Sequence, residues 1–281
     1  MSSKPQTYSS MYERMSGNCT RLIATVMVSS SSPPITHASY ILDNACGPGI
    51  VSEQIKLQHP DARILATDLS PAMIEEVTKR ISTEHWSNMD TDTLDVRDLS
   101  SLKENTFTHV FTNLGLPVPG DTNSSSQITS EIFRVLKPGG VASVSTWADR
   151  VWLTAFYKAG LAIRPNEEPQ TLMALEPEVL RASWLATQLE AGGFGNNIEV
   201  KPCVTCTMAS SLEELVDNMM LAKQMFFSGY SEEELVRVKI IFKEEVQKLR
   251  TFEVFDGGVR IGMKAWIGRG WKRGDEREIA V

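Results

Sequence analysis

The sequence has little that would fasten the chain covalently or direct it into a membrane. It contains four cysteines in 281 residues, without the regular spacing of a disulfide framework. No uninterrupted apolar run approaches the length of a membrane span, and the N-terminal segment MSSKPQTYSSMYERMSG lacks the apolar core of a secretory signal. We therefore expect a cytoplasmic protein that has no membrane partner.

The sequence also lacks an excess of positive charge. It carries 28 lysines and arginines against 35 aspartates and glutamates, a net charge of −7, which argues against nucleic acid as a partner. The composition, 42% apolar and 22% charged, excludes a disordered or fibrous chain. The sequence shows no coiled-coil pattern and no long apolar edge, so we expect a monomer with a single domain over residues 1–281.

Cys203 and Cys206 have the CxxC spacing of some metal sites. The segment around them, NIEVKPCVTCTM, alternates like a strand, and residues three apart on a strand face opposite sides. The sequence has no second cysteine pair and no nearby histidine to complete a zinc site. We therefore expect two structural thiols, and no metal is predicted.

Strands and helices alternate through the first half of the chain. A helix over residues 7–28 and a linker over 29–37 precede the first strand. Strands are predicted at residues 40–45, 63–68, 92–98, 107–113, 141–147, 197–208 and 259–271. The pattern predicts the α/β class, with a doubly wound, Rossmann-like, mostly parallel seven-stranded sheet. Ligands bind such sheets beyond the carboxyl ends of the strands, where the strand order reverses.

The second half of the chain is richer in helix. Helices are predicted at residues 150–163, 177–194, 211–227 and 231–250. Serines open the last two, with glutamates behind them, as expected of helix N-caps. These helices form a helical insert ahead of the last strand.

The stretch ILDNACGPGI (41–50) carries the main functional signal. A buried strand ends in Asp43 and Asn44, and a loop of small residues follows before the next helix. Its glycines suit the geometry of a turn, but small residues also let a ligand approach the backbone. The loop amides and the positive end of the helix favour a carboxylate or phosphate. The next strand ends in Asp68, an acidic residue that suits the two hydroxyls of a ribose.

Four segments resemble, in order, the motifs of class I S-adenosylmethionine-dependent methyltransferases: DNACGPG, TDLSPAM, LDVRDL and FRVLKPGGV. The resemblance covers about residues 38–148 and continues loosely through AGGF and AWIGRGW. Ala45 replaces the family's usual glycine, and Thr108-His109 replaces its usual Phe-Asp. A dinucleotide-binding dehydrogenase is the alternative on fold grounds, but it would prefer a full GxGxxG loop, and the third glycine is absent.

The resemblance implies the cofactor S-adenosyl-L-methionine and a role for each matching residue. Asp43 and the backbone of the loop would hold the methionine moiety, Asp68 the ribose, and Asp95 the adenine amine with the Val96 amide beside it. The implied cofactor-binding residues are Tyr12, Asp43, Ala45, Cys46, Gly47, Gly49, Asp68, Leu69, Met73, Asp95, Val96, Asn113 and Leu114. The chain would divide into an N-terminal lid and linker (1–37), a cofactor-binding core (38–148), and acceptor-side helices with the last strands (149–281).

The sequence offers no obvious catalytic base. None of the four histidines, His37, His59, His85 and His109, sits at the carboxyl end of a predicted strand. No catalytic residue is therefore assigned, and a thiol, carboxylate or amine acceptor is favoured over an aliphatic alcohol. The predicted acceptor wall is Trp147, Trp152, Phe156, Met220 and Phe227, although helical spacing is also typical of core packing.

The overall layout resembles fungal small-molecule methyltransferases of secondary metabolism. Among these, it is similar in size and layout to thiol S-methyltransferases that act on dithiols such as reduced gliotoxin. An O- or N-methyltransferase, a cyclase with the methyltransferase fold, and a regulatory protein that binds the cofactor without transferring methyl stay open as alternatives. Product mass separates a methyltransferase from the cyclase.

Overall fold

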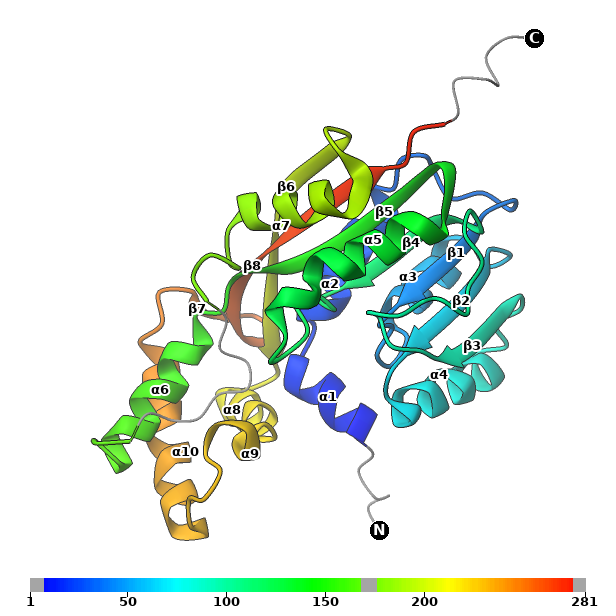
Figure 1. Ribbon diagram of the computed structural model, residues 1–281. Helices are drawn as coiled ribbons and strands as arrows, with labels where there is room; N and C mark the ends of the chain where they lie inside the picture. The colour runs from blue at the N-terminus through cyan, green and yellow to red at the C-terminus, as the bar shows by residue number, and fades with distance from the viewer. Residues whose placement is uncertain (1–7, 168–175, 275–281) are drawn as a thin grey trace, which may run out of the picture. The chain divides into compact units, whose positions relative to one another are not determined.

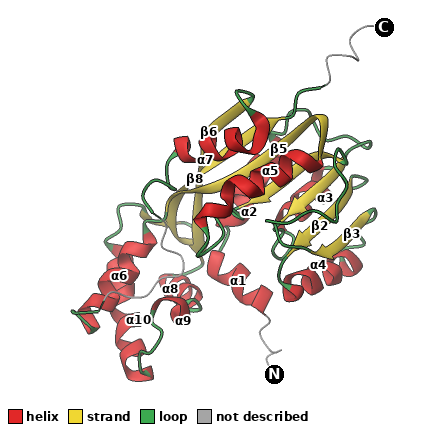
Figure 2. Ribbon diagram, in the orientation of Figure 1, coloured by secondary structure: helices red, strands yellow, loops and turns green. Residues whose placement is uncertain are grey.

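The computed structural model describes residues 8–167 and 176–274, and its strands form one sheet (Figures 1 and 2). Along the sheet the order is β3-β2-β1-β4-β5-β8-β6, and β7 pairs with β8. The strands are β1 (Tyr40–Asn44), β2 (Arg63–Asp68), β3 (Met89–Thr93), β4 (Phe107–Asn113), β5 (Leu136–Asp149), β6 (Ile198–Ala209), β7 (Phe252–Phe255) and β8 (Gly258–Trp271).

Helices connect most of the strands. They are α1 (Tyr8–Ser16), α2 (Cys19–Ser29), α3 (Ile50–Gln58), α4 (Pro71–Thr83), the 3-10 helix η1 (Thr122–Ser124), α5 (Ser125–Val135), α6 (Trp152–Ile163), α7 (Ala182–Leu189), the π-helix η2 (Glu190–Phe194), α8 (Leu212–Met220), α9 (Lys223–Phe226) and α10 (Glu232–Gln247). The predicted α/β class and mostly parallel sheet are confirmed.

The strand order reverses beside β1. This strand pairs in parallel with β2 on one side and with β4 on the other, and Asp43 lies opposite Ala66 and Phe111 in the two registers. The chain leaves β1 toward β2 and returns later to β4, so the loops after β1 and β4 diverge. In doubly wound sheets ligands bind where the strand order reverses in this way, and we call the carboxyl ends of β1 and β4, with the loops that follow them, the crevice.

Helices cover both faces of the sheet. Ile41 faces a core cluster that includes residues of α2, α3 and α4, whereas its neighbour Leu42 faces a cluster with α5 and α7. Successive strand residues point to opposite faces, so this alternation produces the doubly wound arrangement. Figure 2 shows α5 and α7 along the same face of the sheet.

The chain divides into two compact units. The first contains Met1–Leu22, Asp149–Glu176 and Val204–Lys264, and the second contains Ile23–Ala148, Pro177–Cys203 and Ala265–Val281. The second unit holds the crevice beside β1. The predicted single domain with divisions after residues 37 and 148 stays a prediction.

The first unit has an aromatic core of its own. Phe156 on α6 stacks on Phe226 with ring centroids 4.7 Å apart and lies 4.0 Å from the ring of Phe242 on α10. Serine caps begin two of its helices: Ser211 accepts a hydrogen bond from the Glu214 amide, and Ser231 forms a full capping box. The predicted N-caps are therefore confirmed.

Three predicted elements differ from the structure. The helix over 7–28 is wrong, because Gly17 (φ 56°) separates α1 from α2, and an added Cβ there would lie 2.3 Å from the Thr207 hydroxyl. The third strand ends at Thr93 and so lies earlier than predicted. The sheet has eight strands rather than seven, because β7 adds to β8 as an antiparallel hairpin.

Within the described residues, no helix combines the length and the apolar character needed to cross a membrane.

Candidate functional site

The crevice is bordered by two unusual backbone positions. Ala45 follows β1 with φ 54°, and Leu114 follows β4 with φ 58°. Left-handed backbone is unfavourable for residues with a Cβ, and such conformations cluster at functional sites. Gly115 packs closely against Ala45, since an added Cβ would lie 2.9 Å from the Ala45 Cβ. The loops after β1 and β4 are therefore in contact at Ala45 and Gly115, close to where each loop begins and before the two diverge.

Asp43 is a fully buried carboxylate at the base of this crevice. Its Oδ2 accepts hydrogen bonds from the Ser52 amide at 2.9 Å and the Ser52 hydroxyl at 2.6 Å. Ser52 lies in the first turn of α3, where the positive end of the helix favours a negative charge. Its Oδ1 has no hydrogen-bond partner among the residues that the structure describes. Burial raises the pKa of Asp43 to about 6, the Ser52 bonds oppose the rise, and nearby Asp68 adds to it.

The glycine-rich loop uses several of its amides internally. The Cys46 amide donates to the Thr67 carbonyl at 2.9 Å, and the Gly49 amide donates to the Cys46 carbonyl at 3.0 Å. The Gly47 amide donates to Asp68 Oδ2 at 2.8 Å, and Pro48 has no amide hydrogen. Three amides of the loop are therefore engaged within the protein, and the expectation that the loop and the start of α3 receive an anionic group stays a prediction. The free oxygen of Asp43 suits a cation.

Asp68 ends β2 and holds two segments together. Besides Gly47, its carboxylate accepts from the Ser70 amide at 2.9 Å, just ahead of α4. Ser70 is the N-cap residue of α4, but its side chain makes no capping bond. The next residue, Leu69, is 59% exposed, whereas Met73 on α4 is buried. An exposed leucine beside Asp68 provides apolar surface at the position that the resemblance assigns to the nucleoside.

Asp95 follows β3, in a turn that Val96 anchors. The Val96 side chain is buried in the cluster with α5, whereas the side chains of Asp95 and Arg97 are partly exposed. The Arg97 guanidinium forms hydrogen bonds with both oxygens of Asp95 and holds the pKa of that carboxyl below its usual value. The sequence-based interpretation identified Asp95 but missed Arg97, although the Asp-x-Arg spacing is visible in LDVRDL.

Asn113 and Leu114 are fixed by a residue of β5. The Ser145 hydroxyl donates to Asn113 Oδ1 at 2.7 Å and accepts from the Leu114 amide at 2.9 Å. Ser145 was not predicted, because its partners come from a different strand. The structure thus brings together Asp43, the glycine-rich loop, Asp68, Asp95 and the Asn113–Leu114 pair along one edge of the sheet in the second unit.

The predicted acceptor residues are distributed over both units. Trp147, near the end of β5, is partly buried against the cluster with α3 in the second unit. Phe156 and Phe227 are each 1% exposed in the aromatic core of the first unit, and Trp152 and Met220 pack against that core. This burial agrees with the packing alternative for Phe156 and Phe227.

Tyr12, the predicted lid residue, lies on α1 in the first unit. This helix packs against α8 of the same unit, where Arg14 donates to the Asn218 side chain at 3.1 Å. The following helix, α2, contributes Ile23 and Met27 to the core of the second unit. The covering role of Tyr12 stays a prediction.

None of the four histidines is positioned as a base at the carboxyl end of a strand. His109 is buried in β4, where burial lowers its pKa and Nε2 lies 3.0 Å from the Pro33 carbonyl oxygen. His37 and His85 are exposed in loops, and His59 follows α3.

The cysteines are free thiols, and burial raises the pKa of both Cys203 and Cys206. Burial likewise raises the pKa of the Cys46 thiol in the glycine-rich loop. Within residues 8–167 and 176–274, no group of histidine, cysteine and acidic side chains could hold a metal ion.

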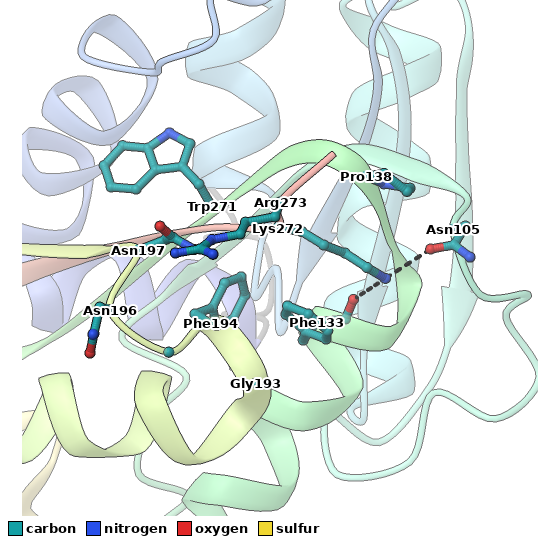
Figure 3. A pocket seen from close by; sticks show the side chains of 11 residues that line it. Asn105, Phe133, Pro138, Gly193, Phe194, Asn196, Asn197, Trp271, Lys272 and Arg273 are labelled. Atoms are coloured by element: carbon teal, nitrogen blue, oxygen red, sulfur yellow. Dashed lines mark hydrogen bonds between the residues drawn. The ribbon is translucent and has the colours of Figure 1, made fainter. Parts of the chain in front are cut away.

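A cavity of about 620 Å³ lies away from the crevice, near the start of β5 (Figure 3). Its walls include Phe133, Phe194 and Trp271. Figure 3 shows Lys272 pointing toward Asn105 and Phe133, and its ammonium donates to the Asn105 side chain at 2.8 Å and to the Phe133 carbonyl at 2.9 Å. Lys272 therefore stabilises the C-terminal end of α5.

The crevice fits the cofactor implied by the resemblance. The unpartnered Asp43 Oδ1 is a buried acceptor of the kind that the ammonium group of a methionine moiety would require. An added Cβ at Gly47 would meet no atom within 4 Å, so open space lies beside the loop. Asp68, Leu69 and Asp95 then offer acceptors and apolar surface for a nucleoside.

Comparison with known proteins agrees with this geometry. Residues 41–140 match a family model described as a methyltransferase domain. The chain is 30% identical over 173 residues to methyltransferase ucsB from Acremonium sp, with 57% of each chain covered. It is 28% identical over 148 residues to the acetylaranotin bis-thiomethyltransferase from Aspergillus terreus, with 51% of this chain and 46% of that protein covered.

Among solved structures, the [4+2]-cyclase SpnF aligns over 90% of this chain and 82% of its own, with a TM-score of 0.55 and 14% identity. This likeness shows the fold. The chain thus spans roughly half of the length of the two curated relatives described above. The predicted family resemblance, enzyme class and cofactor are confirmed at the level of the matched domain.

Proposed function

We propose that the protein transfers a methyl group from S-adenosylmethionine to a small molecule of secondary metabolism, a proposal that the match of residues 41–140 to a methyltransferase-domain model supports. The observation that carries the proposal is Asp43, whose buried Oδ1 lacks a partner in the crevice between β1 and β4. A cationic group held there would place the remainder of the cofactor along the carboxyl ends of β2 and β3, toward Asp68 and Asp95.

We further propose that the acceptor atom is a thiol sulfur. A thiol has a pKa near 8.5, so a useful fraction ionises near neutral pH without a dedicated base. None of the four histidines is placed as such a base. The relative from Aspergillus terreus is named as a bis-thiomethyltransferase, which supports the same acceptor class.

The reaction mainly requires the protein to align the two reactants. The bound cofactor supplies an electrophilic methyl group on a sulfonium. Once its proton had passed to water, a thiolate would form the new S–C bond as the old C–S bond broke and left its electron pair on the departing sulfur. Holding the two reactants in line lowers the barrier to this displacement. Asn113 and Leu114, fixed by Ser145, would line the path to the acceptor.

The other acceptor residues are part of the same proposal. Trp147, Trp152 and Met220 would supply apolar surface for the acceptor, and Tyr12 would cover the cofactor. The monomeric state and the cytoplasmic location stay predictions.

The test is intact-mass analysis of products formed from S-adenosylmethionine and four acceptors: a dithiol, a carboxylic acid, a secondary amine and a phenol. We expect a gain of one or two methyl masses on the dithiol alone. Transfer to the amine or the phenol alone would overturn the thiol assignment and favour N- or O-methylation.

Asp68→Ala serves as the matched variant. It should bind cofactor more weakly and lose activity while keeping its fold, as checked by circular dichroism. Tight binding of S-adenosylhomocysteine without transfer to any acceptor would contradict methyl transfer to these acceptor classes. The cyclase that shares the fold would then be the better candidate, and a change in substrate connectivity without a mass gain would identify it.

A further inference from the structure

The turn after β3 carries an ion-pair network that the family resemblance does not explain. Arg97 Nε donates to Asp95 Oδ1 at 3.0 Å, and an Nη of the same guanidinium donates to Asp95 Oδ2 at 2.6 Å. The Arg97 amide also donates to Asp95 Oδ1 at 2.9 Å. This two-pronged pairing fixes the plane of the carboxylate, which a single contact would not do.

The same guanidinium reaches a second acid on another loop. Its other Nη donates to Asp121 Oδ2 at 3.1 Å, and Asp121 Oδ1 accepts from the Ser124 amide at 3.2 Å at the start of α5. The Gln127 side chain donates to the Arg97 carbonyl at 2.9 Å. Arg97 therefore joins the turn after β3 to the loop between β4 and α5.

The loop between β4 and α5 reaches from the loop after β1 to the turn after β3. It begins beside the glycine-rich loop, where Gly115 packs against Ala45, and it ends at Asp121 on the Arg97 guanidinium. Fixing Asp121 thus fixes the far end of a segment whose near end follows Asn113 and Leu114.

Ordinary surface stabilisation does not account well for such an arrangement. The Arg97 side chain is 35% exposed, and ion pairs at exposed positions contribute little to folding stability. The pairing lowers the pKa of both Asp95 and Asp121, and Arg97 is the main cause in each case. Both acids therefore stay ionised, and Asp95 acts only as a hydrogen-bond acceptor.

We propose that Arg97 is a positioning residue for adenine recognition. Its guanidinium orients the Asp95 carboxylate to accept a hydrogen bond from the adenine 6-amino group, and it fixes the loop after β4 as the opposite wall. The inference rests on the proposed function, because it requires the cofactor to lie along this edge of the sheet.

The test compares two ligands by calorimetry: S-adenosylhomocysteine and an analogue with hydrogen in place of the 6-amino group. The wild-type protein should bind the first about tenfold or more tightly than the second, since a hydrogen bond to an ionised group is lost in the analogue. Arg97→Ala should reduce this preference to about threefold or less, chiefly by weakening S-adenosylhomocysteine. Arg97→Lys should recover only part of it, because an ammonium lacks the planar fork.

Arg260→Ala is the control. Arg260 also pairs with one carboxylate through two donors, to Glu253, but it belongs to the hairpin of β7 and β8. It should leave both affinities unchanged. An Arg97→Ala protein that keeps the wild-type preference, or loses affinity for both ligands equally, would overturn the role of Arg97. A folded wild-type protein that binds neither ligand would instead contradict the proposed function.

Discussion

Asp43 on β1 and Asp95 beyond β3 lie two strands apart on the same edge of the sheet, and their surroundings differ in every respect. Asp43 is fully buried, keeps one oxygen without a partner, and has its pKa raised to about 6 by burial. Asp95 is partly exposed, has both oxygens held by Arg97, and has its pKa lowered. The protein thus supplies partners for both oxygens of Asp95 and leaves one oxygen of Asp43 without a partner among the described residues.

The difference suggests that the two acids make different contributions to cofactor binding. A buried carboxylate without a counter-charge is unfavourable, and a bound ammonium group would remove that cost. At Asp95, by contrast, the Arg97 guanidinium already compensates the carboxylate charge. A ligand there would therefore meet an acceptor of fixed orientation. We therefore expect Asp43 to provide affinity and the Asp95 pair to provide selectivity for the base.

Removal of the Asp43 charge should have the largest effect on cofactor affinity and should abolish the difference between the two acids. Asp43→Asn keeps the size of the side chain and an oxygen for Ser52, but it loses the negative charge that would face the ammonium group. Loss of one partner from a buried charge pair should weaken S-adenosylhomocysteine binding by about a hundredfold or more, as measured by calorimetry at pH 7.5. The exposed Asp90→Asn on β3 should bind normally. An Asp43→Asn protein within about threefold of wild type would place the ammonium elsewhere.

A change of pH should have a smaller effect on cofactor affinity, and it should act through Asp43 rather than Asp95. The pKa of Asp43 is raised from 3.8 to about 6, so protonation below pH 6 removes the charge that binds the ligand. Calorimetry should show constant affinity from pH 8 to 6.5 and about a tenfold loss at pH 5. Asp43→Asn should abolish this dependence. A profile unchanged in that variant would mean that another group titrates.

Ionisation of Asp43 favours ligand binding, but it lowers the folding stability of the ligand-free protein. The folded value lies above the unfolded value, so the stabilising contribution of the protonated acid is present below about pH 3.8 and is lost as the pH rises to about 6. The ionised Asp43 then lowers the unfolding free energy by on the order of 3 kcal/mol. Cofactor binding should restore that stability near neutral pH.

The smallest effect should come from a methyl group in the loop. Gly47 (φ 54°) and Gly139 (φ 80°) both have left-handed backbone, and an added Cβ at either would meet no atom within 4 Å. Each glycine-to-alanine variant should therefore lose about 1 kcal/mol of stability through backbone strain alone. Only Gly47→Ala should also weaken S-adenosylhomocysteine binding, since its methyl group would enter the crevice. Thermal denaturation and calorimetry separate the two effects, and equal affinities would show that no ligand lies beside Gly47.

Much of the fold was predictable, because the buried strands are short apolar runs bounded by turn residues. The third strand was misplaced for a physical reason. It is MDTDT, in which only Met89 is buried, so it has no apolar alternation to detect. The apolar residues that suggested a strand, Leu94 and Val96, anchor the following turn instead. Likewise β7 was missed because three of its four residues are exposed, although Asp256-Gly257 is a recognisable hairpin turn.

Residues of the site that stand in a local sequence motif were predictable, whereas contacts between different strands were not. Asp43, Asp68 and Asp95 each stand in a local motif, and the structure places all three along one edge of the sheet. The engaged loop amides could not be foreseen, because their partners, Thr67 and Asp68, lie on another strand. The same limit applies to Ser145, which acts on residues of β4.

The match to the methyltransferase domain stops at residue 140, inside β5, which runs on to Asp149 and has β8 as its next neighbour in the sheet. A recombinant fragment cut to residues 41–140 would shorten β5 and delete the strand beside it. The unpaired amides and carbonyls of a central strand would then face solvent, which is a template for intermolecular pairing and precipitation. Production of a fragment with an intact sheet therefore requires the chain through Trp271, since β8 lies beside β5 in the sheet.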